Sequence, residues 1–189
     1  MEILFYLSAI CLVIFMILAT YDGFYLHIWK YELFNREESI FEHKTHTVRA
    51  ILFPLIIWFL FINNNQISFW IGIVLVMLDL IILGIDAYSE KDSRQFMDGL
   101  PKWEYIIHLF ANGFHFASII LIIGTKISVS KYTITLIQNV PDTLGSGIME
   151  IISVNIIPGS ILLALVHLIV ILPKGRMIWN RNRIKITCC

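Results

Sequence analysis

The sequence predicts an all-α integral membrane bundle of five transmembrane helices, with the N-terminus outside and the C-terminus in the cytoplasm. Three observations predict this fold class: the composition, five long apolar segments, and the placement of Lys and Arg. The 189-residue chain is 58% hydrophobic and 15% charged, whereas soluble domains average about 45–50% apolar and about 25% charged residues. We therefore expect a single membrane domain over residues 1–189, in a plasma or inner membrane.

Five apolar segments can cross a hydrocarbon core of about 30 Å as helices. The second apolar run, residues 50–62, is too short to span, so its helix must extend backward to include Glu42 and its neighbours. Pro54 is expected to kink that helix. Glu2 precedes the first run without Lys or Arg, which argues against a removable signal peptide. The spans are expected at about residues 3–27, 40–62, 67–88, 103–124 and 151–172.

Lys and Arg lie almost entirely on one side of this topology. Twelve of the 14 basic residues fall before or within the second span, between the third and fourth spans, or in the tail over residues 174–189. The other two, Lys126 and Lys131, fall in a connector over residues 125–147. Because basic residues favour the cytoplasmic side, the tail is expected to be cytoplasmic and the connector extracytoplasmic.

Several function classes are not supported. A net charge of zero argues against nucleic-acid binding, and the chain has no zinc-finger spacing, phosphate-binding Gly loop or nucleophile elbow. The HxxxH and HxxHH boxes of membrane desaturases are absent. Cys11, Cys188 and Cys189 do not form a disulfide framework. The terminal pair could be palmitoylated, although a free reduced tail is the simpler interpretation.

Ionisable side chains within the spans are costly and therefore mark candidate functional sites. All six histidines and most of the carboxylates fall in the cytoplasmic half of the predicted bundle. Imidazole and carboxylate ligands together are typical of zinc, iron or manganese sites. Glu42 precedes His46 by four residues, as Glu104 precedes His108, so each pair shares a helix face. The candidate metal ligands are His43, His46, His108, His115, Glu42, Glu104, Asp79 and Asp86.

Three further residues are secondary candidates: Asp22, His27 and His167. Asp22 and His27 would not share a face on one regular helix. His27 or His167 taken alone is better explained as a hydrogen-bonded structural histidine than as a ligand. Arg49 could bind the charge of a substrate or a lipid headgroup. No catalytic residue is identified.

The preferred interpretation is a non-haem iron enzyme, with two iron ions, of the oxidase or hydroxylase type. Its substrate would be lipid-soluble and would enter from the cytoplasmic leaflet. Iron is favoured over zinc because carboxylates and histidines are mixed, as they are in four-helix di-iron sites. The Glu/His pairs here are four residues apart, however, and do not have the Glu-x-x-His spacing of the soluble di-iron proteins. The metal, the substrate, the oligomeric state and a contribution from a partner subunit are left open.

Other functions are compatible with the same residues. A b-type haem protein could use His115 and His167 as axial ligands. A zinc-dependent membrane hydrolase would use a metal-bound hydroxide. Asp79, Asp86 and His115 could instead pass protons, and a non-catalytic membrane subunit could use these polar groups to hold its helices together.

Overall fold

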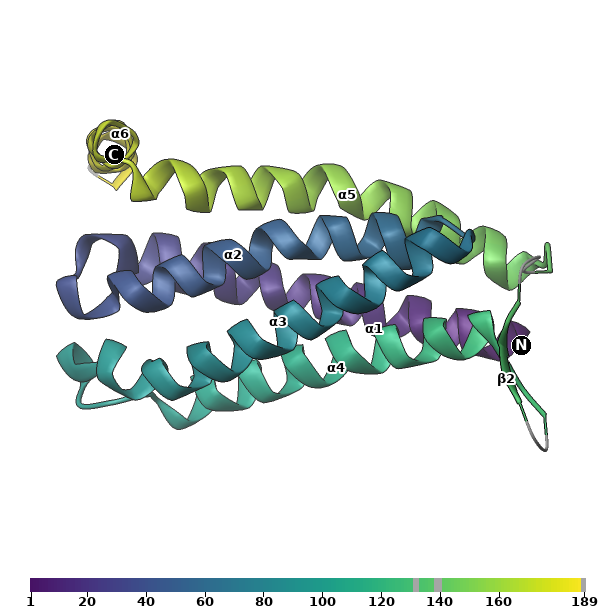
Figure 1. The fold of residues 1–189 in the computed structure, drawn as a ribbon. Coiled ribbons are helices and arrows are strands. Elements are labelled where there is room, and N and C mark those ends of the chain that lie inside the picture. Colours follow the sequence, from purple (N-terminus) through teal and green to yellow (C-terminus); the bar gives the residue numbers. More distant parts are fainter. Residues whose placement is uncertain (131–132, 138–140, 188–189) are drawn as a thin grey trace.

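The computed structural model of the chain describes residues 1–130, 133–137 and 141–187. Within these residues the fold is helical apart from one short hairpin, which confirms the predicted all-α class. Five long helical segments run side by side along a common axis (Figure 1). Each is long and apolar enough to cross a membrane: Glu2–Asn35, Glu37–Ile62, Gln66–Ser93, Lys102–Lys126 and Leu144–Ile171.

The first two segments each combine different helix types. Helix α1 (Glu2–Thr20) continues into the π-helix η1 (Tyr21–Lys30), and the 3₁₀ turns η2 (Leu33–Asn35) and η3 (Glu37–Ser39) lead to α2 (Ile40–Ile56). A second π-helix, η4 (Ile57–Ile62), extends α2 just beyond Pro54. Pro54 lacks the backbone N–H that an α-helix needs at that position, so one backbone hydrogen bond of α2 is missing there.

The remaining elements follow in chain order. They are α3 (Gln66–Ser93), the 3₁₀ turn η5 (Gln95–Met97), α4 (Lys102–Lys126), the antiparallel strands β1 (Ile127–Val129) and β2 (Ile134–Leu136), α5 (Leu144–Ile171) and α6 (Pro173–Thr187). Polar caps fix two of the helix starts. The Asn65 side chain accepts a hydrogen bond from the backbone N–H of Ser68, at 2.8 Å, and Thr143 and Ser146 cap the start of α5 reciprocally.

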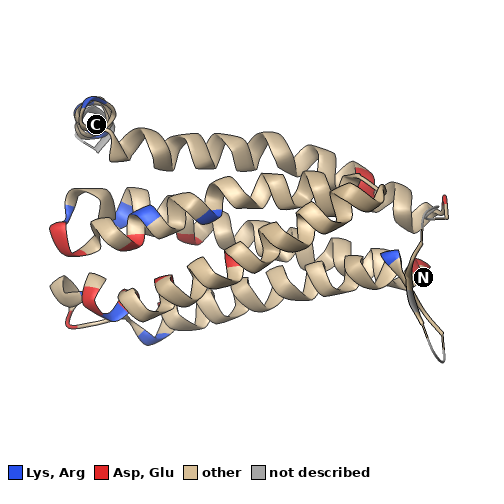
Figure 2. Cartoon of the chain, viewed as in Figure 1, with Lys and Arg blue, Asp and Glu red and all other residues tan. Residues whose placement is uncertain are grey.

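The two ends of the bundle differ in content. The connections between α1 and α2 and between α3 and α4 lie at the same end as α6, whereas the N-terminus and the hairpin lie at the other (Figure 1). Lys, Arg, Asp and Glu gather toward the α6 end (Figure 2). The described part of the basic tail is helical: α6 begins at Pro173, directly after the extended Leu172, and continues to Thr187. Which end faces the cytoplasm stays a prediction.

The interior is divided into an apolar half and a polar half. The apolar half lies toward the N-terminal end, where α1 packs against α4 and η4 packs against α3 and α5. Its fully buried side chains include Leu12, Ile56, Leu60, Ile122 and Met149. Ser8 and Ser118 join α1 to α4 there, each donating its hydroxyl to the other's carbonyl at 2.9 Å. Close helix contacts of this kind stabilise membrane bundles. Because the apolar half holds the helices together, the other half of the bundle can accommodate polar side chains.

Gly72 permits close packing between α3 and η4, and this contact can be tested. A Cβ atom at Gly72 would lie 3.0 Å from Leu60 Cβ and 3.4 Å from Leu60 Cα. We therefore expect Gly72→Val to lower the free energy of unfolding by about 1–3 kcal/mol through overpacking, measured by thermal unfolding in detergent. Gly84→Val on the same helix is the control, because a Cβ there meets nothing within 4 Å. Equal effects of the two substitutions would contradict the packing role.

Candidate metal centre

The π-helix η1 brings Asp22 and His27 onto one face. In a π-helix each backbone hydrogen bond joins residues five apart, so positions 22 and 27 lie one above the other. His27 Nε2 lies 3.4 Å from Asp22 Oδ1, and both side chains are buried. In an α-helix the same five-residue separation would place these two residues on different faces, which is why they were not expected to lie together. The change of helix type is the physical reason why the structure brings them together.

Helices α2 and α4 each present a Glu and a His one turn apart. On α2, Glu42 Oε1 lies 3.8 Å from His46 Nε2, and it lies at the same distance from His27 Nε2 of the π-helix. Glu104 and His108 repeat this four-residue spacing on α4 and are also buried. Residues four apart on an α-helix share a face, so both pairs can point at a common centre.

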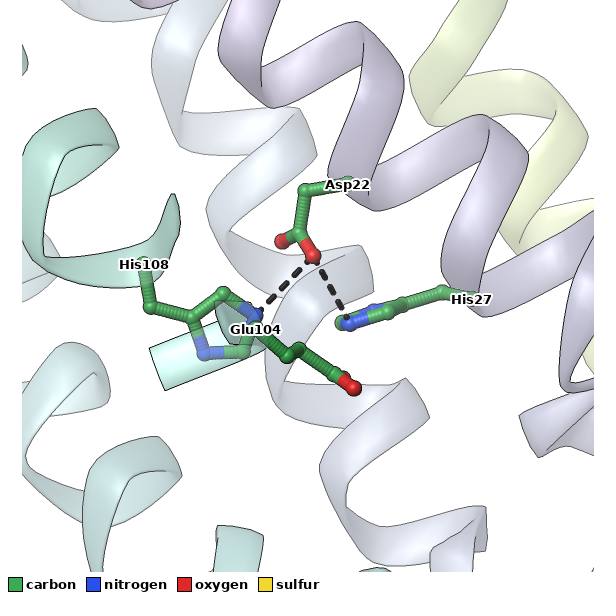
Figure 3. A group of neighbouring side chains, drawn as sticks. All are labelled: Asp22, His27, Glu104 and His108. Atoms are coloured by element: carbon green, nitrogen blue, oxygen red, sulfur yellow. Dashed lines mark hydrogen bonds and ion pairs between the residues drawn. The ribbon is translucent and has the colours of Figure 1, made fainter. Parts of the chain in front are cut away.

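Two groups of candidate ligands follow from this arrangement. In the first group, one ligand atom each from Asp22, His27, Glu104 and His108 lies within 4.8 Å of the others (Figure 3). Asp22 Oδ1 is 2.9 Å from His108 Nε2. The second group joins His27 to Glu42 and His46 within the same limit. His27 belongs to both, so the two groups are adjacent.

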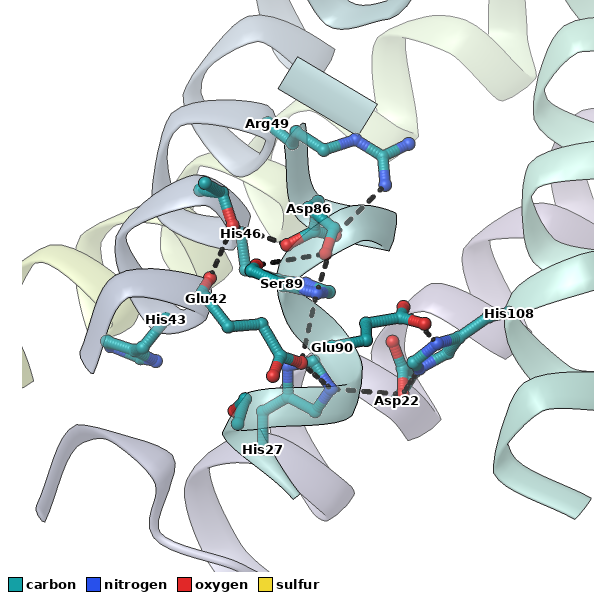
Figure 4. A network of polar contacts seen from close by, with 12 residues as sticks. Asp22, His27, Glu42, His43, His46, Arg49, Asp86, Ser89, Glu90 and His108 are labelled. Atoms are coloured by element: carbon teal, nitrogen blue, oxygen red, sulfur yellow. Dashed lines mark hydrogen bonds and ion pairs between the residues drawn. The ribbon is translucent and has the colours of Figure 1, made fainter. Parts of the chain in front are cut away.

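Helix α3 supplies a carboxylate beside a histidine of each group (Figure 4). Asp86 Oδ2 lies 3.0 Å from His46 Nε2, and Glu90 Oε1 lies 2.6 Å from His108 Nδ1. The Thr45 hydroxyl donates a hydrogen bond to Asp86 and so orients it. Sequence reasoning missed Glu90. Its four-residue spacing from Asp86 was the available signal, since it repeats the spacing on α2 and α4.

Arg94 lies at the centre of the polar half. Its Nη1 is 2.6 Å from Glu42 Oε2, its Nη2 is 2.6 Å from Glu104 Oε1, and Nη2 is also 3.2 Å from His27 Nε2. Burial alone lowers the pKa of Arg94, but the two carboxylates raise it above the usual value, so the guanidinium stays charged. From the sequence, Arg94 was expected only to be one of the basic residues between the third and fourth spans, because it lies beyond the apolar part of the third span.

Asp79 and His115, two predicted ligands, form a separate pair deeper in the bundle. His115 Nε2 lies 3.1 Å from Asp79 Oδ2, and Arg49 Nε donates to Asp79 Oδ1 at 3.1 Å. Arg49 also approaches the ligand groups, with Nη1 at 3.9 Å from Asp86 Oδ2. The structure thus places Asp79 and His115 outside both groups and connects them to Asp86 through Arg49.

His43 and His167 form a third set, between α2 and α5. Their rings stack with centroids 5.0 Å apart and an interplanar angle of 17°, and His43 Nε2 is 3.3 Å from the His167 carbonyl oxygen. One residue step turns a side chain by about 100° around an α-helix. His43 therefore does not share the direction of Glu42, and the structure does not bring it into either ligand group.

A cavity of about 100 Å³ adjoins these sets. Asp22, His46 and His108 line it from the ligand groups, and Asp86 lines it from α3. Asp79 and His115 line it from the deeper pair. Its apolar lining includes Phe15 and Phe53. A ligand in this cavity would therefore lie against apolar rings while remaining next to the candidate metal ligands.

Arg94 can be tested as the electrostatic centre of the polar half. We expect Arg94→Met to lower the free energy of unfolding by about 3–5 kcal/mol, because it leaves buried carboxylates without their cation. Thermal unfolding in detergent measures this loss. Lys91→Met removes an exposed positive charge from the same helix end and should change stability by no more than about 0.5 kcal/mol. A small effect of Arg94→Met would contradict the proposed electrostatic role.

Comparison with known proteins does not assign a function to this site. No protein-family model, curated protein or solved structure matches the chain. The side chains of the polar half are therefore the basis for a functional hypothesis. They form a buried His/Asp/Glu cluster that could hold a metal ion, within a helical bundle whose long helices are compatible with a membrane.

Proposed function

We propose that the protein is a membrane-embedded metalloenzyme that binds two iron ions and oxidises a lipid-soluble substrate. One ion would be held by Asp22, Glu104 and His108, and the other by Glu42, His46 and Asp86. His27 is assigned to neither ion, because its Nε2 lies 3.2 Å from Arg94 Nη2, and an arginine only donates, so this nitrogen accepts that hydrogen bond. The observation that carries this proposal is the pair of adjacent ligand groups, drawn from η1, α2 and α4 and completed by α3.

The arrangement of His108 supports a role as a metal ligand. Its Nδ1 lies 2.6 Å from Glu90 Oε1, and its Nε2 lies close to Asp22. A metal-binding histidine commonly donates its other N–H to a carboxylate, which fixes the tautomer and the ring orientation. Glu90 would then hold the proton at Nδ1 and leave Nε2 free to bind the ion.

The charge of the polar half also favours cations. Five carboxylates line the two groups and their partners on α3: Asp22, Glu42, Asp86, Glu90 and Glu104. Arg94 balances one of them, and Arg49 is bonded to Asp79. If the imidazoles are neutral, four negative charges stay unbalanced, and unpaired buried charges are strongly destabilising. Two divalent cations would neutralise them.

Two carboxylate oxygens are available for such cations. Glu42 Oε1 and Glu104 Oε2 are buried and have no hydrogen-bond partner among the described residues. Arg94 binds the other oxygen of each carboxylate, Glu42 Oε2 and Glu104 Oε1. Arg94 could therefore remain in place and orient both carboxylates while their free oxygens bind metal.

Iron is preferred over zinc because imidazole and carboxylate ligands from several helices of one bundle are typical of di-iron sites. Iron would supply the chemistry of dioxygen. In the oxidase form, each of two substrate molecules would give up two electrons and two protons, and one O₂ would become two molecules of water. The surrounding helices would keep bulk water out. The end that carries α6 and most basic residues is proposed to face the cytoplasm, so the substrate would enter from that leaflet.

A structural ion cluster is the second candidate function. Arg94 pairs with both Glu42 and Glu104 at 2.6 Å, and protonated histidines could neutralise the remaining acids. In that case the polar half would hold the helices together without a metal. The b-type haem alternative is less well supported, because His115 pairs with Asp79 and His167 stacks on His43.

Metal analysis of the purified full chain separates these functions. We expect about two iron ions per chain and no Soret band. His46→Ala and His108→Ala should each lose about one of them, because each removes a ligand of a different ion. Loss of only a hydrogen-bond partner of a ligand already weakens metal binding about 10–100-fold, and loss of the ligand itself should weaken it at least as much. Elemental analysis after dialysis against a weak chelator measures this loss.

His43→Ala is the matched control, because it removes a buried histidine of the same helix that lies outside both ligand groups. It should retain full metal. Folded wild-type protein without bound metal, after growth and purification with added iron, would favour the structural ion cluster. Zinc in place of iron would favour the hydrolase, and a Soret band would favour haem.

A further inference from the structure

We infer that the outer face of helix α6 binds the headgroup layer of an anionic phospholipid membrane. This outer face consists of Lys174, Met177, Ile178 and Arg181. The inference goes beyond the proposed function, because it assigns a lipid partner to a helix outside the five spans. It is also independent of the metal centre, since none of these residues belongs to either ligand group.

The inner face of α6 is attached to the bundle along the length of the helix. Its residues are Arg176, Trp179, Asn180 and Arg183. Trp179 packs against the buried side chain of Val170, and Arg176 Nε donates to the Val170 carbonyl at 3.4 Å. Asn180 exchanges side-chain hydrogen bonds with Asn35 at 3.2 Å, and Arg183 forms an ion pair with Glu32. These contacts fix how α6 is turned about its own axis.

The outer face repeats the same spacing on the opposite side of α6. It is offset from the inner face by two residues, which is about 200° around an α-helix. Met177 is 65% exposed and Ile178 is 49% exposed, and the Lys174 and Arg181 side chains before and after them are exposed too. A helix face that combines apolar side chains with cations is typical of helices that lie in a membrane interface.

Helix α5 brings α6 to the level of the lipid headgroups. The 28 residues of α5 extend about 42 Å at about 1.5 Å per residue, which matches the roughly 40–45 Å of a bilayer with its headgroup layers. Helix α6 begins two residues later, at Pro173. It is seen nearly end-on in Figure 1, while the five spans run across the view. Helix α6 therefore lies crosswise to the spans, along the plane of a membrane surface.

The charge of α6 selects an anionic lipid. Residues 173–187 contain five Lys and Arg residues and no Asp or Glu. Among the described residues, neither Lys174 nor Arg181 takes part in an ion pair. Lipid phosphates would supply the missing anions, and Met177 and Ile178 would enter the apolar boundary just below them. An acidic soluble protein would match the cations, but it would not explain the apolar side chains at headgroup depth.

A fluorophore on the outer face tests whether this face lies in lipid. Met177→Cys, in a full chain whose three native cysteines are changed to Ser, would carry a nitrobenzoxadiazole label. We expect the label in nanodiscs of phosphatidylcholine with phosphatidylglycerol to emit further to the blue than in pure phosphatidylcholine, and to be protected from acrylamide. High salt should reverse both changes, because it screens the attraction between charges. Equal emission and quenching in the two kinds of disc would overturn the inference.

Removal of the two outer-face cations should weaken this attachment. Each basic residue near an anionic surface strengthens binding roughly fivefold, so Lys174→Gln with Arg181→Gln should lower the ratio of protected to exposed label about thirtyfold. Lys91→Gln with Lys102→Gln is the matched control, because it removes two exposed cations that flank the connection between α3 and α4. An equal loss in both double variants would show a general charge effect and would overturn the assignment to α6.

Two other occupants of the outer face give different results in the same experiment. Protection that requires two copies of the chain in one disc, and that does not depend on phosphatidylglycerol, would assign the face to a second copy. A label that acrylamide reaches in every lipid would show that the face points into water, as the binding of a soluble partner requires. Either result would reject the lipid interface.

Discussion

The burial of carboxylates inside an apolar bundle imposes the constraint on which the polar half depends. The five buried ones are Asp22, Glu42, Asp79, Asp86 and Glu104. Each must be neutralised or hydrogen-bonded, because an isolated buried charge destabilises a fold strongly. Arg94 meets part of this requirement by pairing with Glu42 and Glu104, which joins the loop after α3 to both α2 and α4. The histidines, and the proposed metal ions, would meet the rest. The bundle can tolerate these buried charges because the apolar packing at the opposite end holds the helices together.

The helical class, the number of long apolar segments and the polar half were predictable from the sequence, because each depends on composition along one chain. The short apolar run at residues 50–62 also indicated that the second helix must include the His/Glu segment, and α2 begins at Ile40. These inferences need only the length of a helix that crosses a bilayer. The orientation of the bundle stays a prediction.

The internal grouping of the site was not predictable in the same way. Depth along the helices placed His43 and His115 with the other candidates, but depth says nothing about direction around a helix axis. In the structure His43 turns toward α5 and His115 pairs with Asp79. Arg94 and Glu90 were missed for a related reason, since both lie near the end of α3, where polar residues are ordinarily solvated. Only the packing of α3 against its neighbours makes them central.

The π-helical segment Tyr21–Lys30 has a consequence for how this site can vary among related chains. A π-helix closes each backbone hydrogen bond one residue later than an α-helix does, so it holds one additional residue between positions that share a face. Exposed positions such as Phe24 and Tyr25 can be exchanged for other apolar residues without moving the site. Loss of a single codon between Asp22 and His27 would leave the acid and the histidine four residues apart, the spacing at which an α-helix brings side chains onto one face. Divergence in this segment can therefore include a one-residue deletion that comes with a change to α-helix, as well as replacement of exposed residues.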